Sequence, residues 1–331
     1  MSVPIDAEVD GTISGRQHLP AAGRWPLGVR LPRSLADFDR RGFRTDRPDA
    51  RELLEGHAQA FIAGFDLASS RWSHVHEALA DVPAFERGFA YEGAAMYAAL
   101  RDAATFGRAQ ALAHVLRDAG DGYAHLVHVG YGWGLGPLRS GWFPRLPDTP
   151  LLRWLALDGA GFCHAFFGGL PAVRRLAAAP ATLVREARLA GCGRALWFIE
   201  AADVRSVAAA IAGVPASAQR SLWAGVGLAV AYAGGAVGAD LDDLADLGSR
   251  HRPGFGQGVL FGAAARARAG IVPPYTNAVC VRVLGIDAHE AGRLADRASA
   301  DLGSPGSLAD FLEWKTRLQH AVADVLDSRG A

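Results

Sequence analysis

The chain has 331 residues, of which 50% are hydrophobic and 21% charged, a composition typical of a globular protein. Its 34 basic and 34 acidic residues give a formal net charge of zero without any long block of like charge, which argues against electrostatic capture of nucleic acid. Lys315 is the single lysine, and its Glu-Trp-Lys-Thr context fits neither a Schiff-base enzyme nor a Walker-type phosphate loop.

The cysteines are three in number and widely spaced, at Cys163, Cys192 and Cys280, with no C-x-x-C pair. This usage argues against a disulfide framework and against a cysteine-rich metal site, and no metal ligand set is predicted. The first twenty residues carry three acidic side chains and lack an apolar core, so no secretory signal is expected. A cytoplasmic location is therefore predicted.

In chain order, residues 1–50 form an N-terminal extension with scattered prolines, followed by two halves at 51–185 and 186–300. Residues 301–331 hold a C-terminal helix. Alanine, leucine and arginine dominate the periodic segments, and these residues favour helix. The sequence therefore predicts a mainly α fold of two tandem, related helical halves.

The two halves share several short patterns in the same order, which predicts an ancient duplication. Val-Pro-Ala occurs at 82–84 and again at 214–216, after which Gly93 aligns with Gly225 at the same offset. A row of glycines, namely Gly130, Gly132 and Gly136, then aligns with Gly256, Gly258 and Gly262. A weaker similarity sets residues 149–158 against 276–285.

An amphipathic helical stretch precedes each Val-Pro-Ala, at Leu53–Leu79 and at Arg194–Ile211. Proline ends or begins a helix rather than continuing one, so each Val-Pro-Ala should separate two helices. The runs 194–200 and 278–284 also suit short strands, which leaves open a small sheet joining the halves.

Two further segments lead to specific expectations. Ser221–Ala239 is uncharged over 19 residues, but its many glycines and alanines favour a buried core helix over a membrane span. Ser307–Leu326 has the apolar spacing of one helical face, and Ser307 is a candidate N-cap because Asp310 follows three residues later.

Glu92 is the clearest candidate for chemistry, because it is a carboxylate inside the apolar stretch FAYEGAAMYAAL. Burying a charge costs several kcal/mol, roughly, unless the group is paired or protonated. The aligned position in the second half is Ala224, so the fold itself does not require a carboxylate there. Glu92 is thus either a catalytic acid or base, or one partner of an ion pair with Arg87 or Arg101.

Two pairs of polar residues form a second group of candidates. His125 and His128 are three residues apart and would share a helix face, where both imidazoles could reach one metal ion or one substrate, although two histidines alone do not complete a metal site. The alternative is a pair of hydrogen-bonded core histidines. Asp158 and His164 lie in WLALDGAGFCHAFFGG, where they are candidates for an oriented general base, or for an Asp-Gly turn beside a half-buried histidine. Cys163 points away from His164 if this segment is helical.

Several aromatic residues suit a pocket for a long hydrophobic molecule, although an ordinary core would also use them. The candidates for substrate contact are Tyr91, Trp133, Trp154 and Trp223. The glycine rows lack the G-x-G-x-x-G pattern and a ribose-binding carboxylate, so close helix packing or the wall of a flat apolar pocket explains them better than nucleotide binding.

Four strings in the chain resemble the UnbL-like family, a domain of unknown function found in enediyne biosynthetic clusters. They are RGFAYEGAAM (87–96), LLRWLALDGAGF (151–162), GRALWFIEAADV (193–204) and LWAGVGLAVAYAGG (222–235). The resemblance extends from about Arg51 to Arg297. One departure is that the family is expected to have histidine directly after the Gly-Phe, where this chain has Cys163 followed by His164.

The resemblance implies an accessory role beside an iterative, polyene-forming polyketide synthase. It implies UnbU-type membrane and UnbV-type partners, with which the chain would lie at the inner face of the membrane. The expected function is binding of a linear conjugated polyene and help in converting it toward the enediyne core precursor. Two alternatives remain: a non-catalytic scaffold and an acid–base cyclase or isomerase. A homo-oligomer is compatible with either alternative. No cofactor is identified.

Overall fold

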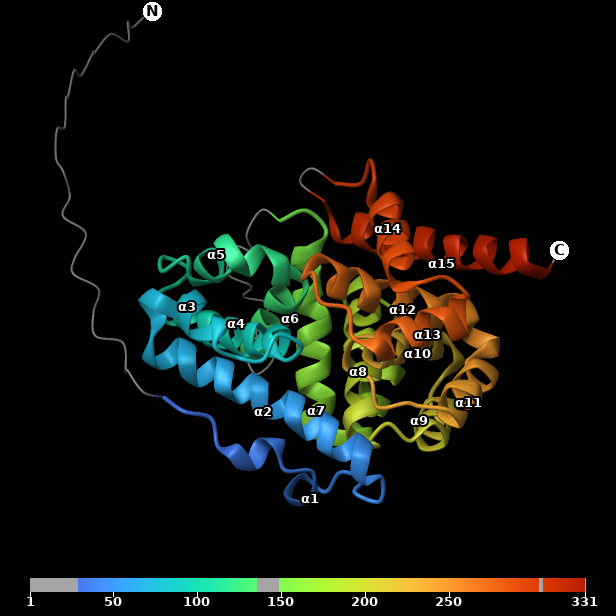
Figure 1. Cartoon of the computed structure of the whole chain (residues 1–331), viewed down its shortest axis with the longest axis horizontal. Helices are drawn as coiled ribbons and strands as arrows, with labels where there is room; N and C mark the ends of the chain where they lie inside the picture. The colour runs from blue at the N-terminus through green and yellow to red at the C-terminus, as the bar shows by residue number, and fades with distance from the viewer. Residues whose placement is uncertain (1–28, 136–148, 304–305, 331) are drawn as a thin grey trace, which may run out of the picture.

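The computed structural model describes residues 29–135, 149–303 and 306–330, and within these ranges it contains fifteen α-helices and no strand. The predicted mainly α fold is therefore confirmed (Figure 1). The helices are α1 (Phe38–Arg41), α2 (Pro48–Ser70), α3 (Val75–Ala80), α4 (Arg87–Ala104), α5 (Ala111–Val115), α6 (Ala124–Leu135), α7 (Leu155–Ala178), α8 (Leu183–Ile199), α9 (Val204–Ala212), α10 (Ala216–Ala233), α11 (Ala239–Leu247), α12 (Arg252–Arg268), α13 (Pro274–Leu284), α14 (Ala288–Ser299) and α15 (Leu308–Gly330).

Seven of these helices pack in the order in which they occur along the chain: α2, α4, α6, α7, α8, α10 and α12. In Figure 1, α7 and α8 stand side by side near the centre, with α2 and α4 on one side and α10 and α12 on the other. Hydrogen bonds also connect α2 with α10, and α12 with the segment just before α4. His57 Nε2 lies 2.9 Å from the Ala233 carbonyl, and Arg266 Nη1 donates to the Phe85 carbonyl at 2.8 Å.

Glycines set the spacing between successive helices of the series. A Cβ added at Gly191 on α8 would lie 1.8 Å from the Asp158 carbonyl oxygen on α7, and one added at Gly161 would lie 1.9 Å from the Arg188 carbonyl oxygen. Such distances are far inside van der Waals contact, so these positions admit no side chain while the backbones stay in place. The predicted role of the glycine rows in close helix packing is confirmed, since Gly130 and Gly258 meet neighbouring backbones in the same way.

Gly191→Ala is accordingly expected to lower the free energy of unfolding by about 1–3 kcal/mol, because the new methyl group would force α7 and α8 apart. Gly56→Ala on α2 is the matched control, because nothing lies within 4 Å of its added Cβ. That variant should gain about 0.5–1 kcal/mol from the higher helix propensity of alanine. Denaturant unfolding of both variants tests the claim, and a Gly191→Ala protein as stable as Gly56→Ala would refute it.

The expectation of a small sheet is wrong for both candidate strands. Residues 194–199 belong to α8, with Glu200 as its C-cap, and residues 278–284 belong to α13. The segment at 194–200 looks strand-like because α8 is buried on several faces, which removes the polar positions that reveal a helical period.

The expected long helices before each Val-Pro-Ala are both interrupted. The first breaks where α2 ends at Ser70, because Arg71 leaves the helical region at φ −130° and ψ 41°. The second breaks between α8 and α9, where Asp203 caps α9 by accepting from the Ser206 amide. The Val-Pro-Ala segments separate helices as predicted, with Pro215 as the N-cap of α10.

The C-terminal helix and its cap are confirmed. In α15 the Asp310 amide donates to Ser307 Oγ at 3.1 Å, and the Ser307 amide donates to the Asp310 carboxylate at 2.6 Å, which is a reciprocal capping arrangement.

Most of the uncharged stretch at 221–239 lies in α10, which packs between α8 and α12. Over the described ranges, no helix combines the length and apolarity needed to cross a membrane.

The duplication and the boundaries at 50, 185 and 300 stay predictions. Apolar contacts form one large core cluster that extends from Phe38 to Val322 through both proposed halves. Residues 1–28 of the expected extension, and Gly136 of the glycine row, lie outside the described residues.

Candidate functional site

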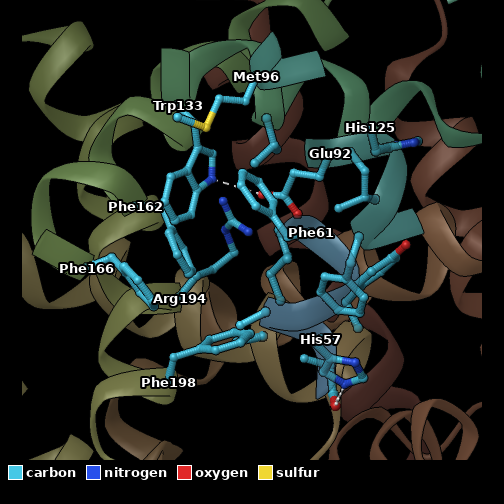
Figure 2. Close-up of a pocket in the computed structure, with 18 of the residues that line it drawn as sticks. His57, Phe61, Glu92, Met96, His125, Trp133, Phe162, Phe166, Arg194 and Phe198 are labelled. Carbon is cyan, nitrogen blue, oxygen red and sulfur yellow. Dashed lines mark hydrogen bonds between the residues drawn. The ribbon is translucent and has the colours of Figure 1, made fainter. Parts of the chain in front are cut away.

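The seven serially packed helices surround a cavity, and each of them contributes side chains to its wall. Its void space totals about 1060 Å³, a figure that includes the gaps between atoms and the part open to solvent, so the room free for a ligand is smaller. Its lining is mostly apolar and rich in aromatic rings (Figure 2). The lining residues are Leu31, Leu35, His57, Ala58, Phe61, Ile62, Phe89, Glu92, Met96, His125, Leu126, Val129, Trp133, Leu155, Phe162, Phe166, Phe167, Arg194, Phe198, Leu228, Ala229, Tyr232, Ala233, Phe261 and Ala265.

An aromatic cluster forms one wall of the cavity. The Trp133 ring packs against Phe61 and Phe162, with ring centroids 4.9 Å apart in both pairs. Phe162 in turn stacks on Phe166 and meets Phe198 edge to face. Flat rings at these positions suit contact with a flat, conjugated molecule.

Glu92 lies on α4 with its carboxyl group in the cavity wall, and the residue is only 4% exposed. Trp133 Nε1 donates to Glu92 Oε1 at 3.0 Å. Burial raises the pKa of Glu92 to about 7, opposed by the nearby Arg194 guanidinium and by the Trp133 hydrogen bond. The carboxyl group can therefore both hold and release a proton near neutral pH.

The expected alternative, an ion pair between Glu92 and Arg87 or Arg101, does not occur. Arg87 donates instead to the carbonyls of Ala80 and Val82. Arg101 lies over the Trp72 ring, with its guanidinium carbon 4.7 Å from the ring centroid.

Asp158 on α7 forms a buried ion pair with Arg194 on α8, and the two residues are 3% and 6% exposed. Arg194 Nε donates to Asp158 Oδ1 at 2.8 Å. Its Nη2 lies 2.6 Å from the same oxygen, at an angle that does not form a second hydrogen bond. The guanidinium also lies over the Phe162 ring, and Figure 2 shows it directed into the same space as Glu92.

The predicted pairing of Asp158 with His164 is not present. Six residues along a helix correspond to 240° beyond one full turn, so the two side chains leave α7 in different directions. His164 is half-buried near Arg188 and Arg175, outside the cavity lining, and burial lowers its pKa. Burial raises the pKa of Cys163 to about 11, which disfavours the nucleophilic thiolate.

His125 and His128 lie three residues apart on α6, and only His125 lines the cavity. Neither the His125 Nδ1 atom nor either nitrogen of His128 has a hydrogen-bond partner among the described residues. Burial lowers the pKa of both histidines to about 3, so both imidazoles are neutral at physiological pH. No group of three or more His, Cys, Asp or Glu side chains within the described ranges is arranged to hold a metal ion.

Three of the four aromatic candidates lie outside the cavity lining, and only Trp133 lies within it. The Tyr91 hydroxyl lies 3.0 Å from His76 Nδ1 in a second core cluster. Trp154 Nε1 donates to the Gly306 carbonyl at 3.0 Å, and Trp223 packs edge to face against Phe255. These rings stabilise helix contacts away from the cavity.

Sequence reasoning missed Arg194 and His57 as cavity residues. Arg194 is the one charged residue in the stretch GCGRALWFI, a signal of the same kind as that of Glu92. His57 has the Glu86 carboxylate 2.7 Å from its Nδ1 and the Ala233 carbonyl at its Nε2, so both ring nitrogens are already engaged. Neither partner of His57 is close to it in the sequence.

Comparison with known proteins identifies a family but no characterised relative. The family described as "Protein of unknown function (DUF1702)" matches residues 29–322. No curated protein matches the chain, and no solved structure matches it.

Proposed function

This chain belongs to the DUF1702 family of proteins of unknown function, and we propose that it binds a linear conjugated polyene in the cavity between its seven serially packed helices. In this proposal it serves as an accessory protein of enediyne or polyene polyketide biosynthesis and assists conversion of the polyene toward the core precursor. The resemblance to the UnbL-like family motivates the pathway, including UnbU-type and UnbV-type partners that would hold the chain at the inner face of the membrane.

The observation that carries the binding proposal is an apolar cavity walled by tilted, stacked and edge-to-face aromatic rings, with Glu92 and Arg194 facing the same space. Apolar pockets with few polar groups use those groups to orient a ligand. A long conjugated chain would lie against Phe61, Trp133 and Phe162, and its end would meet Glu92 and Arg194.

Binding can be tested with 1,6-diphenylhexatriene, a linear conjugated hydrocarbon that fluoresces in apolar surroundings. We expect saturable fluorescence enhancement with one site per chain, and competition by a longer natural polyene. Protein unfolded in denaturant serves as the control. Fluorescence that rises linearly with protein and never saturates would count against the proposal.

Acid–base catalysis is a second candidate function, favoured by the pKa of about 7 of the buried Glu92. The carboxylate would remove a proton from the γ carbon of a conjugated carbonyl compound. The C–H electrons would enter the conjugated system, and the same carboxyl group would return the proton at the α carbon, so that no co-reactant is consumed.

This second candidate predicts that a conjugated enone with a saturated γ carbon, incubated with the protein in D₂O, gains deuterium, as measured by mass spectrometry. Glu92→Gln should bind the enone but lose at least about 100-fold of the exchange rate, which is the usual contribution of a positioned general base. Exchange at the wild-type rate in folded Glu92→Gln would instead favour a binding scaffold without acid–base chemistry.

A further inference from the structure

Asp158 already neutralises the charge of Arg194, the cationic side chain in the cavity wall. Arg194 Nε donates to Asp158 Oδ1 at 2.8 Å, and both residues are buried. A ligand carboxylate entering the cavity would therefore meet an ion pair with no net charge. Transfer of a carboxylate from water into the apolar cavity costs free energy, and here no unpaired cation offsets that cost.

Glu92 faces the same space without a partner that neutralises it. The charged and titratable groups around it are Arg194, Asp158, Tyr232, His125 and, on α2, His57, whose Nδ1 is paired with the Glu86 carboxylate. Because Trp133 donates to Oε1, the proton of a neutral Glu92 belongs on Oε2, which makes that atom a hydrogen-bond donor. An ionised Glu92 would repel a ligand carboxylate, whereas the protonated form can donate to a neutral acceptor.

The other polar groups of the lining supply no free cation for a carboxylate. His125 is neutral because burial lowers its pKa to about 3, and the Tyr232 hydroxyl is buried against Gly88 on α4. The positive charge of Arg266 lies behind the Tyr232 ring, where its N–H groups are occupied by the carbonyls of Tyr232 and Phe85 and by the Tyr275 hydroxyl.

On the basis of the proposed polyene binding, we propose that the cavity selects conjugated chains whose polar end is an uncharged hydrogen-bond acceptor, such as a ketone, aldehyde or ester. Free carboxylic acids of the same length are excluded in their ionised form. Glu92, hydrogen-bonded to Trp133, is the residue that determines this selectivity, and Asp158 acts with it by neutralising Arg194.

The test compares two probes that differ only in charge: trans-parinaric acid, a conjugated tetraene acid, and its methyl ester. At pH 8 we expect the ester to bind at least tenfold more tightly, as measured by the fluorescence of the tetraene. If only the protonated form of Glu92 binds the ester, the fraction of competent protein changes from about one tenth at pH 8 to about nine tenths at pH 6, so affinity should rise about tenfold. Glu92→Gln should abolish this pH dependence.

Asp158→Asn provides a gain-of-function variant, because it leaves the Arg194 charge without its partner. Because Arg194 could then pair with an ionised Glu92, the comparison is made in the Glu92→Gln background. There, Asp158→Asn should make the protein bind the acid at least tenfold more tightly than Glu92→Gln alone does, with little change for the ester. Circular dichroism confirms that the variant is folded, and Glu92→Gln tests the proposal independently if it is not.

Equal affinity of the wild type for acid and ester at pH 8 would overturn the selectivity while leaving polyene binding intact. Failure of both probes to bind would overturn the polyene-binding proposal itself. Acid binding that exceeds ester binding would likewise overturn the selectivity, because it would assign Arg194 the role of a carboxylate anchor.

Discussion

Arg194→Met is expected to lower the free energy of unfolding by about 3–5 kcal/mol, because it leaves the buried Asp158 carboxylate without its counter-charge. The Asp158–Arg194 pair is nearly inaccessible to water, so solvent stabilises the remaining carboxylate far less than the guanidinium does. Methionine fills much of the volume of arginine, and the loss should therefore come mainly from the unpaired charge rather than from a cavity. Urea unfolding at neutral pH measures it.

Two controls separate the charge from the packing. The double variant Arg194→Met with Asp158→Leu removes both charges and should recover most of the lost stability, since apolar replacements of buried ion pairs are often neutral. Arg205→Met removes an exposed partner of Asp243 and should change stability by less than about 1 kcal/mol. A double variant as unstable as Arg194→Met would contradict the account.

Glu92→Gln should become more stable relative to the wild type as the pH rises. In the unfolded chain Glu92 ionises near 4.5, whereas burial raises its pKa in the folded protein to about 7. Between these values the folded protein binds a proton that the unfolded chain has lost, so wild-type stability falls as the pH increases through this window. A rise in pKa from 4.5 to about 7 corresponds to about 3 kcal/mol.

The measurement is the difference in unfolding free energy between Glu92→Gln and the wild type at pH 4 and at pH 8. We expect this difference to shift by about 3 kcal/mol in favour of the variant, because glutamine keeps the acceptor for Trp133 but has no charge to bury. Glu77→Gln, at an exposed glutamate, should show no such shift. A difference that stays constant between the two pH values would show that Glu92 ionises as freely in the folded protein as in the unfolded chain.

The sequence was sufficient to single out Glu92, because a carboxylate within a long apolar helix is costly wherever the helix packs. It was also sufficient for the helical class, the Val-Pro-Ala boundaries and the cap at Ser307, all of which depend on residues close together in the chain. These are local signals, and the structure confirms the helical class and the cap directly.

The ion-pair partner of Asp158 could not be predicted from the sequence. Arg194 is 36 positions away, and the two side chains meet only because Gly191 and Gly161 allow α7 and α8 to approach in one register. His164 is closer in sequence but emerges on another face of the same helix. Sequence also does not distinguish Trp133, which lines the cavity, from Trp154 and Trp223, which do not, since aromatic rings at helix contacts and in a cavity wall have the same sequence pattern.

The central claim is that a conjugated chain occupies the cavity between the seven serially packed helices, and a paired substitution on α2 tests it most directly. Ala58 lines the cavity, whereas its neighbour Gln59 is exposed and is not part of the lining. Affinity for the methyl ester of trans-parinaric acid should fall at least tenfold in Ala58→Trp, because the indole would occupy the ligand's space, and should be unchanged in Gln59→Trp. Undiminished binding by folded Ala58→Trp would place the ligand elsewhere and contradict the account.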